Sequence, residues 1–244
     1  MAVNLMIKDR ESPAPAGRGK GGRLATLEQG ANLLQEATPL KGFDVYVVGF
    51  HCAKGEPDMQ MEAHHYCRVV NDDLLQCVVF DGNTKDANLV GIEYIVSGRL
   101  FETMPAGERP YWHPHNFEVL SGQLVAPGLP DAAEKALMKQ LMNSYGKTWH
   151  TWHTGGRTGT DLPYGDPKLM WSFNRDGECD EELRRDRNEA MSVDTAAKRA
   201  DRQSFLGIAR PQWGVDEMKD DFPHTAPIPG VTDVRDAGEP GTKS

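Results

Sequence analysis

Apolar and polar residues alternate over most of the chain between residues 40 and 175, as they do in strands that bury one face. β-Branched and aromatic residues, which strands favour, are frequent there. Seven segments predict strands: 43–52, 63–70, 74–82, 88–97, 116–127, 146–153 and 168–174. The short turn at Asp81-Gly82-Asn83 predicts that the third and fourth strands pair in an antiparallel manner.

Two segments have helical spacing instead. The first begins at Asp131, where Glu134 completes a capping-box-like signal, and Gly146 stands where a left-handed stop is expected. The second is a charged helix at about 180–202, whose apolar residues follow three- and four-residue spacing. We expect it on the outside of the sheet or against a partner subunit. Together the elements predict an α+β fold, largely an antiparallel β-sheet or a partly closed barrel with two or more flanking helices.

The two ends differ in composition from the middle. Residues 1–38 contain two prolines and the run GRGKGG with few apolar residues, which predicts a flexible N-terminal leader. Residues 216–244 are rich in Pro, Gly and Asp, which predicts an extended C-terminal tail. Between them, 39–215 is expected to form a single domain, since it has no internal repeat.

Composition narrows the class of protein. The 244 residues include 39% hydrophobic and 26% charged residues, which is typical of a soluble globular protein. The net charge of −9 counts against a general partner such as nucleic acid or an anionic membrane.

Cysteine usage and the N-terminal sequence predict the compartment. The chain has four cysteines, which form no CxxC pair and are too sparse for a disulfide framework. We expect free thiols in a reducing compartment, with Cys67 and Cys77 as small buried apolar residues. Neither a signal-like apolar segment nor a stretch of about 20 apolar residues occurs, so we predict a cytoplasmic location.

Histidine is the main chemical signal. Seven of the eight histidines lie in or beside predicted strands: His51, His64, His65, His113, His115, His150 and His153. Sets of imidazoles and carboxylates suit a divalent transition metal such as Zn or Fe better than Mg or Ca.

The segment His113-Pro114-His115 is the sharpest motif. Two residues apart on an extended chain, both imidazoles project to one face, and Glu118 follows three residues later. The stretch from Gly107 to Gly122 resembles the first motif of cupin barrels, although its His-to-Glu gap is shorter than in cupins. The resemblance implies a cupin-like barrel with these two histidines and Glu118 as metal ligands; the alternative is that the histidines only form hydrogen bonds in a loop.

Alternation separates the other candidates. His64 and His65 project to opposite faces of a strand, so only one can enter a given pocket, and we keep both as metal ligands. His150 is the inner histidine of its strand and a candidate metal ligand or catalytic residue. Glu93 lies among apolar residues and is either on the surface or buried with a partner; if buried, it is a second catalytic candidate.

Six blocks in order, among them GFHCAKGEPDMQMEAHHYC, LVGIEYIVS and YGKTWHTWH, resemble the oil body-associated protein family, a domain of unknown function. The resemblance covers residues 39–175. It implies histidines at positions 51, 64, 65, 113, 115 and 150, and association of plant members with seed oil bodies. It implies no established reaction.

Two hypotheses follow. In the first, a histidine-lined pocket binds a transition metal and a small-molecule ligand, which would suit a metalloenzyme of undefined reaction. In the second, the protein is non-catalytic, associates with a lipid-droplet surface or has a structural role, and its histidines form a buried polar network. A homo-oligomer that assembles through the charged helix is a third reading.

Overall fold

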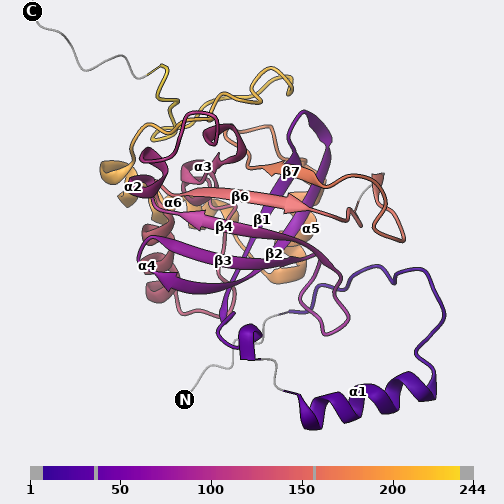
Figure 1. Ribbon diagram of the computed structural model, residues 1–244. Helices are drawn as coiled ribbons and strands as arrows, with labels where there is room; N and C mark the ends of the chain where they lie inside the picture. The colour runs from indigo at the N-terminus through magenta and orange to yellow at the C-terminus, as the bar shows by residue number, and fades with distance from the viewer. Residues whose placement is uncertain (1–7, 36–37, 156–157, 237–244) are drawn as a thin grey trace, which may run out of the picture.

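The computed structural model describes residues 8–35, 38–155 and 158–236 (Figure 1). In these residues, six antiparallel strands form a closed barrel: β1 (Val45–Ala53), β2 (Glu56–Asn71), β3 (Leu74–Phe80), β4 (Leu89–Val96), β6 (Tyr145–His150) and β7 (Lys168–Trp171). The strand order is β4-β3-β2-β1-β7-β6, and pairing of β6 with β4 closes the circle. The short strand β5 (His113–Pro114) pairs with the first residues of β6. The predicted α+β fold is confirmed, and its barrel is closed.

Six of the seven predicted strands are present, and β2 begins seven residues earlier than expected. The seventh prediction, a strand at 116–127, is wrong. Its first residues form the helix α3 (Asn116–Leu120), and Val125 makes only an isolated bridge with Val48. All residues of α3 are buried, so the apolar run does not mark one face of a strand, and periodicity alone does not separate a short buried helix from a buried strand.

The predicted helix at Asp131 is α4 (Asp131–Leu141), but its signals act differently from our expectation. Glu134 does not close a capping box: its buried carboxylate accepts from the backbone N–H of Ala126 and pairs with Arg202. The chain turns at Asn143, which has a φ of 63°, two residues after the helix ends. Gly146 is therefore not a helix stop and lies within β6.

The predicted charged helix is two helices, α5 (Glu181–Met191) and α6 (Thr195–Arg202), followed by the 3-10 helix η4 (Gln203–Ile208). The break comes at Ser192, which has a left-handed φ of 55°. Asp194 then caps α6 by accepting a hydrogen bond from Ala197. The remaining short elements are η1 (Thr38–Leu40), α2 (Gly98–Glu102) and η2 (Arg109–Tyr111). None of the helices in the described ranges is long and apolar enough to cross a membrane.

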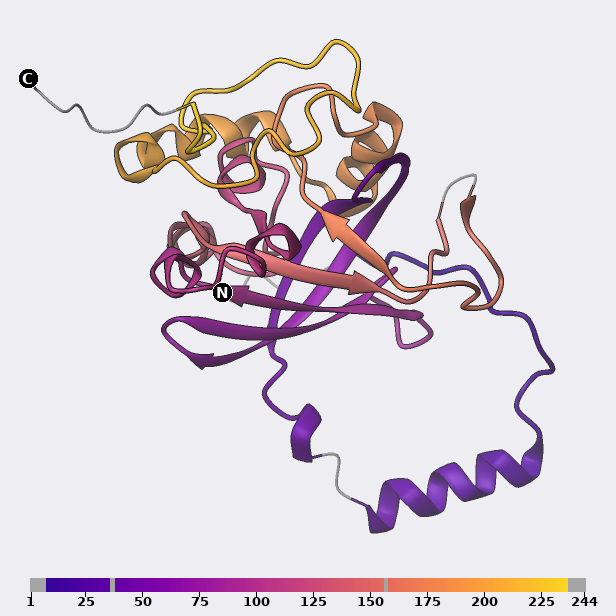
Figure 2. The same ribbon diagram turned by 45° about the horizontal axis from the view of Figure 1, so that its top comes forward.

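The predicted leader contains a helix that the sequence pattern did not reveal. This helix, α1 (Gly22–Leu34), stands apart from the barrel in both views and buries none of its described side chains (Figures 1 and 2). Before α1, the guanidinium of Arg10 donates two hydrogen bonds to Glu62 on β2, at 2.7 and 3.0 Å. Part of the predicted leader, at Arg10, therefore contacts the barrel.

The main apolar core joins one end of the barrel to the helices beside it. Barrel residues such as Val47 and Ile95 pack in one cluster with Phe117 of α3 and Met138 of α4. The cluster also includes Met218, Ile228 and Val231, which lie in the predicted C-terminal tail. The described tail (216–236, yellow in Figure 2) therefore covers the core, because these side chains supply part of the apolar surface buried there.

The expectation of four free thiols is wrong for one pair, since Cys67 and Cys77 form a disulfide. They are direct partners in the antiparallel register of β2 and β3, with Cα atoms 4.0 Å apart. A CxxC search does not find such a pair, whereas the pairing of the two predicted strands could have indicated it. Cys52 and Cys179 are free and buried.

Candidate metal centre

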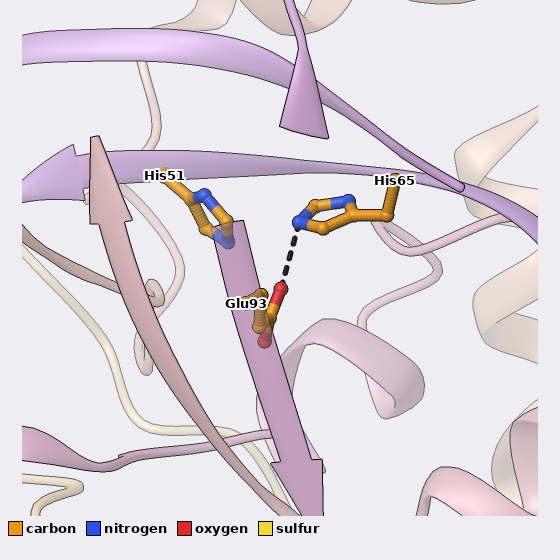
Figure 3. Close-up of side chains that lie close together, drawn as sticks. All are labelled: His51, His65 and Glu93. Atoms are coloured by element: carbon orange, nitrogen blue, oxygen red, sulfur yellow. Dashed lines mark ion pairs between the residues drawn. The ribbon is translucent and has the colours of Figure 1, made fainter. Parts of the chain in front are cut away.

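The barrel interior collects polar side chains from several strands. Along each strand every second side chain points inward, which brings His51 of β1, His65 of β2, Glu93 of β4 and His150 of β6 into the same space. Figure 3 shows His51, His65 and Glu93 pointing toward one another from three strands. The strand β5 and the residue that follows it add His113 and His115 at one end of this space. Each of the six residues is at most 3% exposed.

Glu93 lies at the centre of the cluster. Its Oε2 is 2.8 Å from Nε2 of His65, and its Oε1 is 3.3 Å from Nε2 of His115 and 3.5 Å from Nε2 of His113. The Nε2 atoms of His113 and His115 are 3.2 Å apart. Within the described ranges, the donors form two groups that could hold a metal ion, His51/His65/Glu93 and Glu93/His113/His115.

Gly146 makes this approach possible. A Cβ atom at this position would lie 2.1 Å from Oε1 of Glu93 and 2.6 Å from Nε2 of both His113 and His115. These contacts are far shorter than any side chain allows, so the three donor atoms lie directly over a bare backbone. The donor atoms of Glu93, His113 and His115 can therefore lie beside residue 146 only because it has no side chain.

The environment favours an ionised Glu93. Burial alone would raise the pKa of this carboxyl, but the charge of His65 and hydrogen bonds from His113 and His115 hold it well below its ordinary value. The carboxylate is thus available as a ligand at neutral pH.

Three of the histidines, His51, His115 and His150, are held in the neutral form. Burial lowers the pKa of His150 to about 3, with a further contribution from His65. Burial is also the largest cause of the lowered pKa values of His51 and His115. A neutral imidazole keeps one ring nitrogen free to bind a metal, so these rings have the protonation state that ligands require.

Glu118 lies at the edge of the cluster, with Oε2 3.8 Å from Nε2 of His115. Burial and the nearby charge of Glu93 raise the pKa of Glu118 well above its ordinary value. A neighbouring cation would oppose that shift and favour the carboxylate form. The structure thus places the third residue of the cupin-like motif beside the histidines, on α3.

Several buried atoms of the cluster have no hydrogen-bond partner among the described residues. These atoms are Nδ1 of His51, both ring nitrogens of His65, Nδ1 of His113, Nε2 of His150 and the hydroxyl of Thr148. Nε2 of His65 is close to Glu93, but its direction does not satisfy a hydrogen bond. Unsatisfied buried polar atoms are costly, and a bound ion would compensate part of that cost, so the donor set fits a transition metal.

The structure brings together most of the residues singled out from the sequence, but not His64. As alternation requires, His64 points to the opposite face of β2, where its Nδ1 is 2.7 Å from the hydroxyl of Tyr46 and its Nε2 is 3.0 Å from Glu62. Our expectation of His64 as a ligand beside His65 is therefore corrected.

His51 was not among the residues we selected as metal ligands, although it contributes to one of the two groups. Alternation along the predicted strand 43–52 does not show which face of that strand lines the metal centre, so it gave no reason to select His51 as a ligand. The antiparallel pairing of β1 with β2 supplies that reason, because it places His51 and His65 on one face with ring centroids 5.0 Å apart.

A cavity of about 760 Å³ lies beside the cluster. Met61 forms part of its wall, and the Sδ atom of Met61 is 3.1 Å from Nδ1 of His150. Seven carboxylates and one guanidinium are among its lining side chains: Glu11, Asp58, Glu62, Asp81, Asp180, Glu182, Asp186 and Arg10. The clustered imidazoles do not line this cavity, so the expected histidine-lined pocket is instead a packed centre next to an acidic cavity.

Comparison with known proteins identifies the family. Residues 37–206 match the family described as "Protein of unknown function (DUF1264)". The chain belongs to this family. Oil body-associated protein 2B of Arabidopsis thaliana is 35% identical over 88% of this chain and 92% of its own length, and oil body-associated protein 2A of the same plant is 33% identical over 82% and 81%. Oil body-associated protein 1A of Zea mays is 38% identical over 65% and 66%.

These matches confirm the resemblance to the oil body-associated proteins that the sequence blocks indicated. No solved structure matches the chain, so the likeness to cupins stays a prediction from one motif.

Proposed function

We propose that this protein binds a divalent transition metal, Zn or Fe, inside its barrel and a small molecule beside it. The observation that carries the proposal is the convergence of four imidazoles on one ionised carboxylate, Glu93, in a space where several ring nitrogens have no hydrogen-bond partner among the described residues. Neutral imidazole and carboxylate together suit these metals.

A metal bound with an open coordination position would supply Lewis-acid or bound-water chemistry, as a metalloenzyme requires. Of the two residues predicted to be catalytic, Glu93 is surrounded by imidazoles and is better placed as a ligand. His150 lies between the cluster and Met61 on the cavity wall, so it is the residue better placed to contact a substrate.

The acidic cavity supports the small-molecule part of the proposal. Its volume is in the range of about 300–1,000 Å³ found for ligand sites. Because carboxylates dominate its lining, it favours a ligand with a positively charged group.

Metal analysis of untagged protein tests this function. We expect a transition metal to co-purify with the wild-type chain or to be retained after loading with Zn²⁺ and desalting. Glu93→Gln should lose it, because Glu93 belongs to both donor groups. His64→Gln is the matched control, since His64 is equally buried but lies on the opposite face of β2.

The second candidate function is a structural one, in which the cluster is a polar network without a metal. Two hydrogen bonds of His115 favour it, one of 3.2 Å between the Nε2 atoms of His115 and His113 and one of 2.8 Å between Nδ1 of His115 and the hydroxyl of Ser144. A folded wild-type protein that retains no Zn²⁺ would support this candidate and contradict the metal-binding proposal.

We also propose a lipid-droplet surface as a partner, from the names of the relatives. Helix α1 is the candidate contact, because its four leucines, Leu24, Leu27, Leu33 and Leu34, are 60–86% exposed. In flotation with phospholipid-coated triacylglycerol droplets, Leu24→Gln/Leu27→Gln should reduce recovery. The control Leu129→Gln/Val234→Gln replaces two exposed apolar residues elsewhere.

We also propose that the protein is located in the cytoplasm and that it forms a homo-oligomer.

A further inference from the structure

We infer that the cluster holds two cations bridged by the carboxylate of Glu93. This inference rests on the metal-binding function proposed above and specifies its stoichiometry. In the described part of the chain, the donor atoms form two sets of three, His51/His65/Glu93 and Glu93/His113/His115, and within each set they lie within 4.8 Å of one another. Among the described residues, Glu93 alone belongs to both sets.

One ion could not bind all five residues in this arrangement. Metal–nitrogen and metal–oxygen bonds are about 2.1 Å long, so two ligands of one ion are at most about 4.2 Å apart. The five donors do not form a single set even at the wider limit of 4.8 Å. A single ion would serve one set and leave the imidazoles of the other buried without a metal.

The two oxygens of Glu93 are already divided between the two sets. Oε2 is 2.8 Å from Nε2 of His65, whereas Oε1 is 3.3 Å from Nε2 of His115 and 3.5 Å from Nε2 of His113. A carboxylate that offers one oxygen to each ion is suited to two ions about 3.5–4 Å apart, as in two-metal sites.

Each set also has a further donor beside it. The ring of His150 lies 5.5 Å from that of His51, and its buried Nε2 has no hydrogen-bond partner among the described residues. On the other side, Oε2 of Glu118 is 3.8 Å from Nε2 of His115. Each ion would thus have up to four protein ligands, three of them its own and Glu93 shared, which is the number that tetrahedral Zn²⁺ takes.

A glycine in the backbone lets the donor atoms of the second set approach one another closely. Gly146 lies under Glu93 Oε1 and the Nε2 atoms of His113 and His115, where no Cβ fits. Gly91 lets β4 pair closely with β6 beside His150, because a Cβ there would overlap the backbone of Trp149 and would lie 2.6 Å from Cδ2 of the His150 ring.

Metal stoichiometry tests the inference. The untagged chain is stripped with a chelator, loaded with excess Co²⁺ or Zn²⁺, desalted and measured by mass spectrometry of the metal. We expect two ions per chain in the wild type. His51→Gln/His65→Gln and His113→Gln/His115→Gln should each retain one ion, and His64→Gln should retain two.

A wild type that binds one ion, lost in both pair variants, would overturn the two-ion inference and leave the metal-binding function intact. A folded wild type that binds none would overturn both. If a pair variant does not fold, Co²⁺ electron paramagnetic resonance of the wild type decides instead. Two bridged ions should show a spin-coupled signal at full loading, whereas an uncoupled signal would overturn the bridge.

Discussion

At the scale of single residues, the proposed metal centre depends on Glu93 and Gly146, whose roles are set by the side chains around them. Glu93 faces three imidazoles, which offset the cost of burying its charge. Gly146 contributes no side chain, yet its bare backbone sets the distance between Glu93 and two histidines. Neither residue belongs to a recognisable local motif, so their roles follow from contacts across the barrel.

Gly146→Ala should both destabilise the protein and reduce metal retention. The new Cβ would overlap Oε1 of Glu93 at 2.1 Å, and relief requires β6 or the carboxylate to move. Overpacking of this kind costs about 1–3 kcal/mol, measurable by urea unfolding. The control Gly207→Ala adds the same atom where nothing lies within 4 Å, and should change stability by less than about 0.5 kcal/mol. Equal effects of the two variants would contradict the close approach at Gly146.

Glu178 should make stability depend on pH. Burial raises the pKa of this carboxyl from 4.5 to about 7, although it accepts hydrogen bonds from the backbone N–H groups of Asn174 and Arg175. The folded state therefore binds the proton more tightly, and stability decreases as pH rises from 4.5 through 7.

Glu178→Gln keeps an acceptor but removes this titration, so its stability relative to wild type should increase by about 3 kcal/mol between pH 4.5 and 8. Urea unfolding at several pH values measures the difference. Glu181→Gln, which replaces an exposed carboxylate of α5, is the control and should follow the wild-type curve. Parallel curves for Glu178→Gln and wild type would argue against the raised pKa.

At the scale of elements, strand pairing determines which side chains become neighbours across the sheet. The register that joins β2 to β3 sets Cys67 opposite Cys77, and the next pairing sets Cys77 opposite Glu93. The disulfide and the centre are thus neighbours on one row of the sheet. Helix boundaries were harder to predict. Ser192 ends α5 in a left-handed conformation, which residues other than glycine rarely adopt, so the sequence does not indicate this end.

The cap of α6 should stabilise the second of the two helices. The Asp194 side chain accepts a hydrogen bond of 2.9 Å from the N–H of Ala197. Asp194→Ala removes the acceptor and should lower the free energy of unfolding by about 1 kcal/mol, whereas Asp194→Asn keeps an acceptor and should stay close to wild type. Urea unfolding of both variants checks this, and an equal loss in both would exclude capping as the cause.

At the scale of the whole molecule, the closed barrel turns residues from distant parts of the sequence into neighbours. Pairing of β4 with β6 brings Glu93 beside Thr148, 55 residues further along, and pairing of β5 with β6 brings His113 to Gly146. The proposed centre therefore links β1, β2, β4, β5 and β6. Loss of the metal should lower the stability of the whole barrel.

Metal loading should raise the melting temperature of the whole barrel. An ion that binds only the folded state at 1,000 times its dissociation constant adds about 4 kcal/mol, or roughly 10 °C for a chain of this size. Calorimetry with Zn²⁺ and with a chelator measures the shift. Glu93→Gln should show little of it, and an equal shift in this variant would place the stabilising ion elsewhere.

The sequence by itself determined the class of fold, six strands, the position of α4 and the family. These depend on local patterns of side chains and on six blocks in order, which folding does not change. The sequence also indicated His65, His113, His115, His150 and Glu93 as candidate site residues. Residue type, and the face of a strand on which a side chain lies, can both be read from the local sequence.

Only the tertiary structure decided which candidates meet. Closure of the barrel excluded His64, added His51 and made Gly146 part of the centre, since these outcomes depend on which strands pair and in what register. The same is true of the disulfide and of the C-terminal segment that covers the core. Such contacts join residues far apart in the chain, and local periodicity carries no information about them.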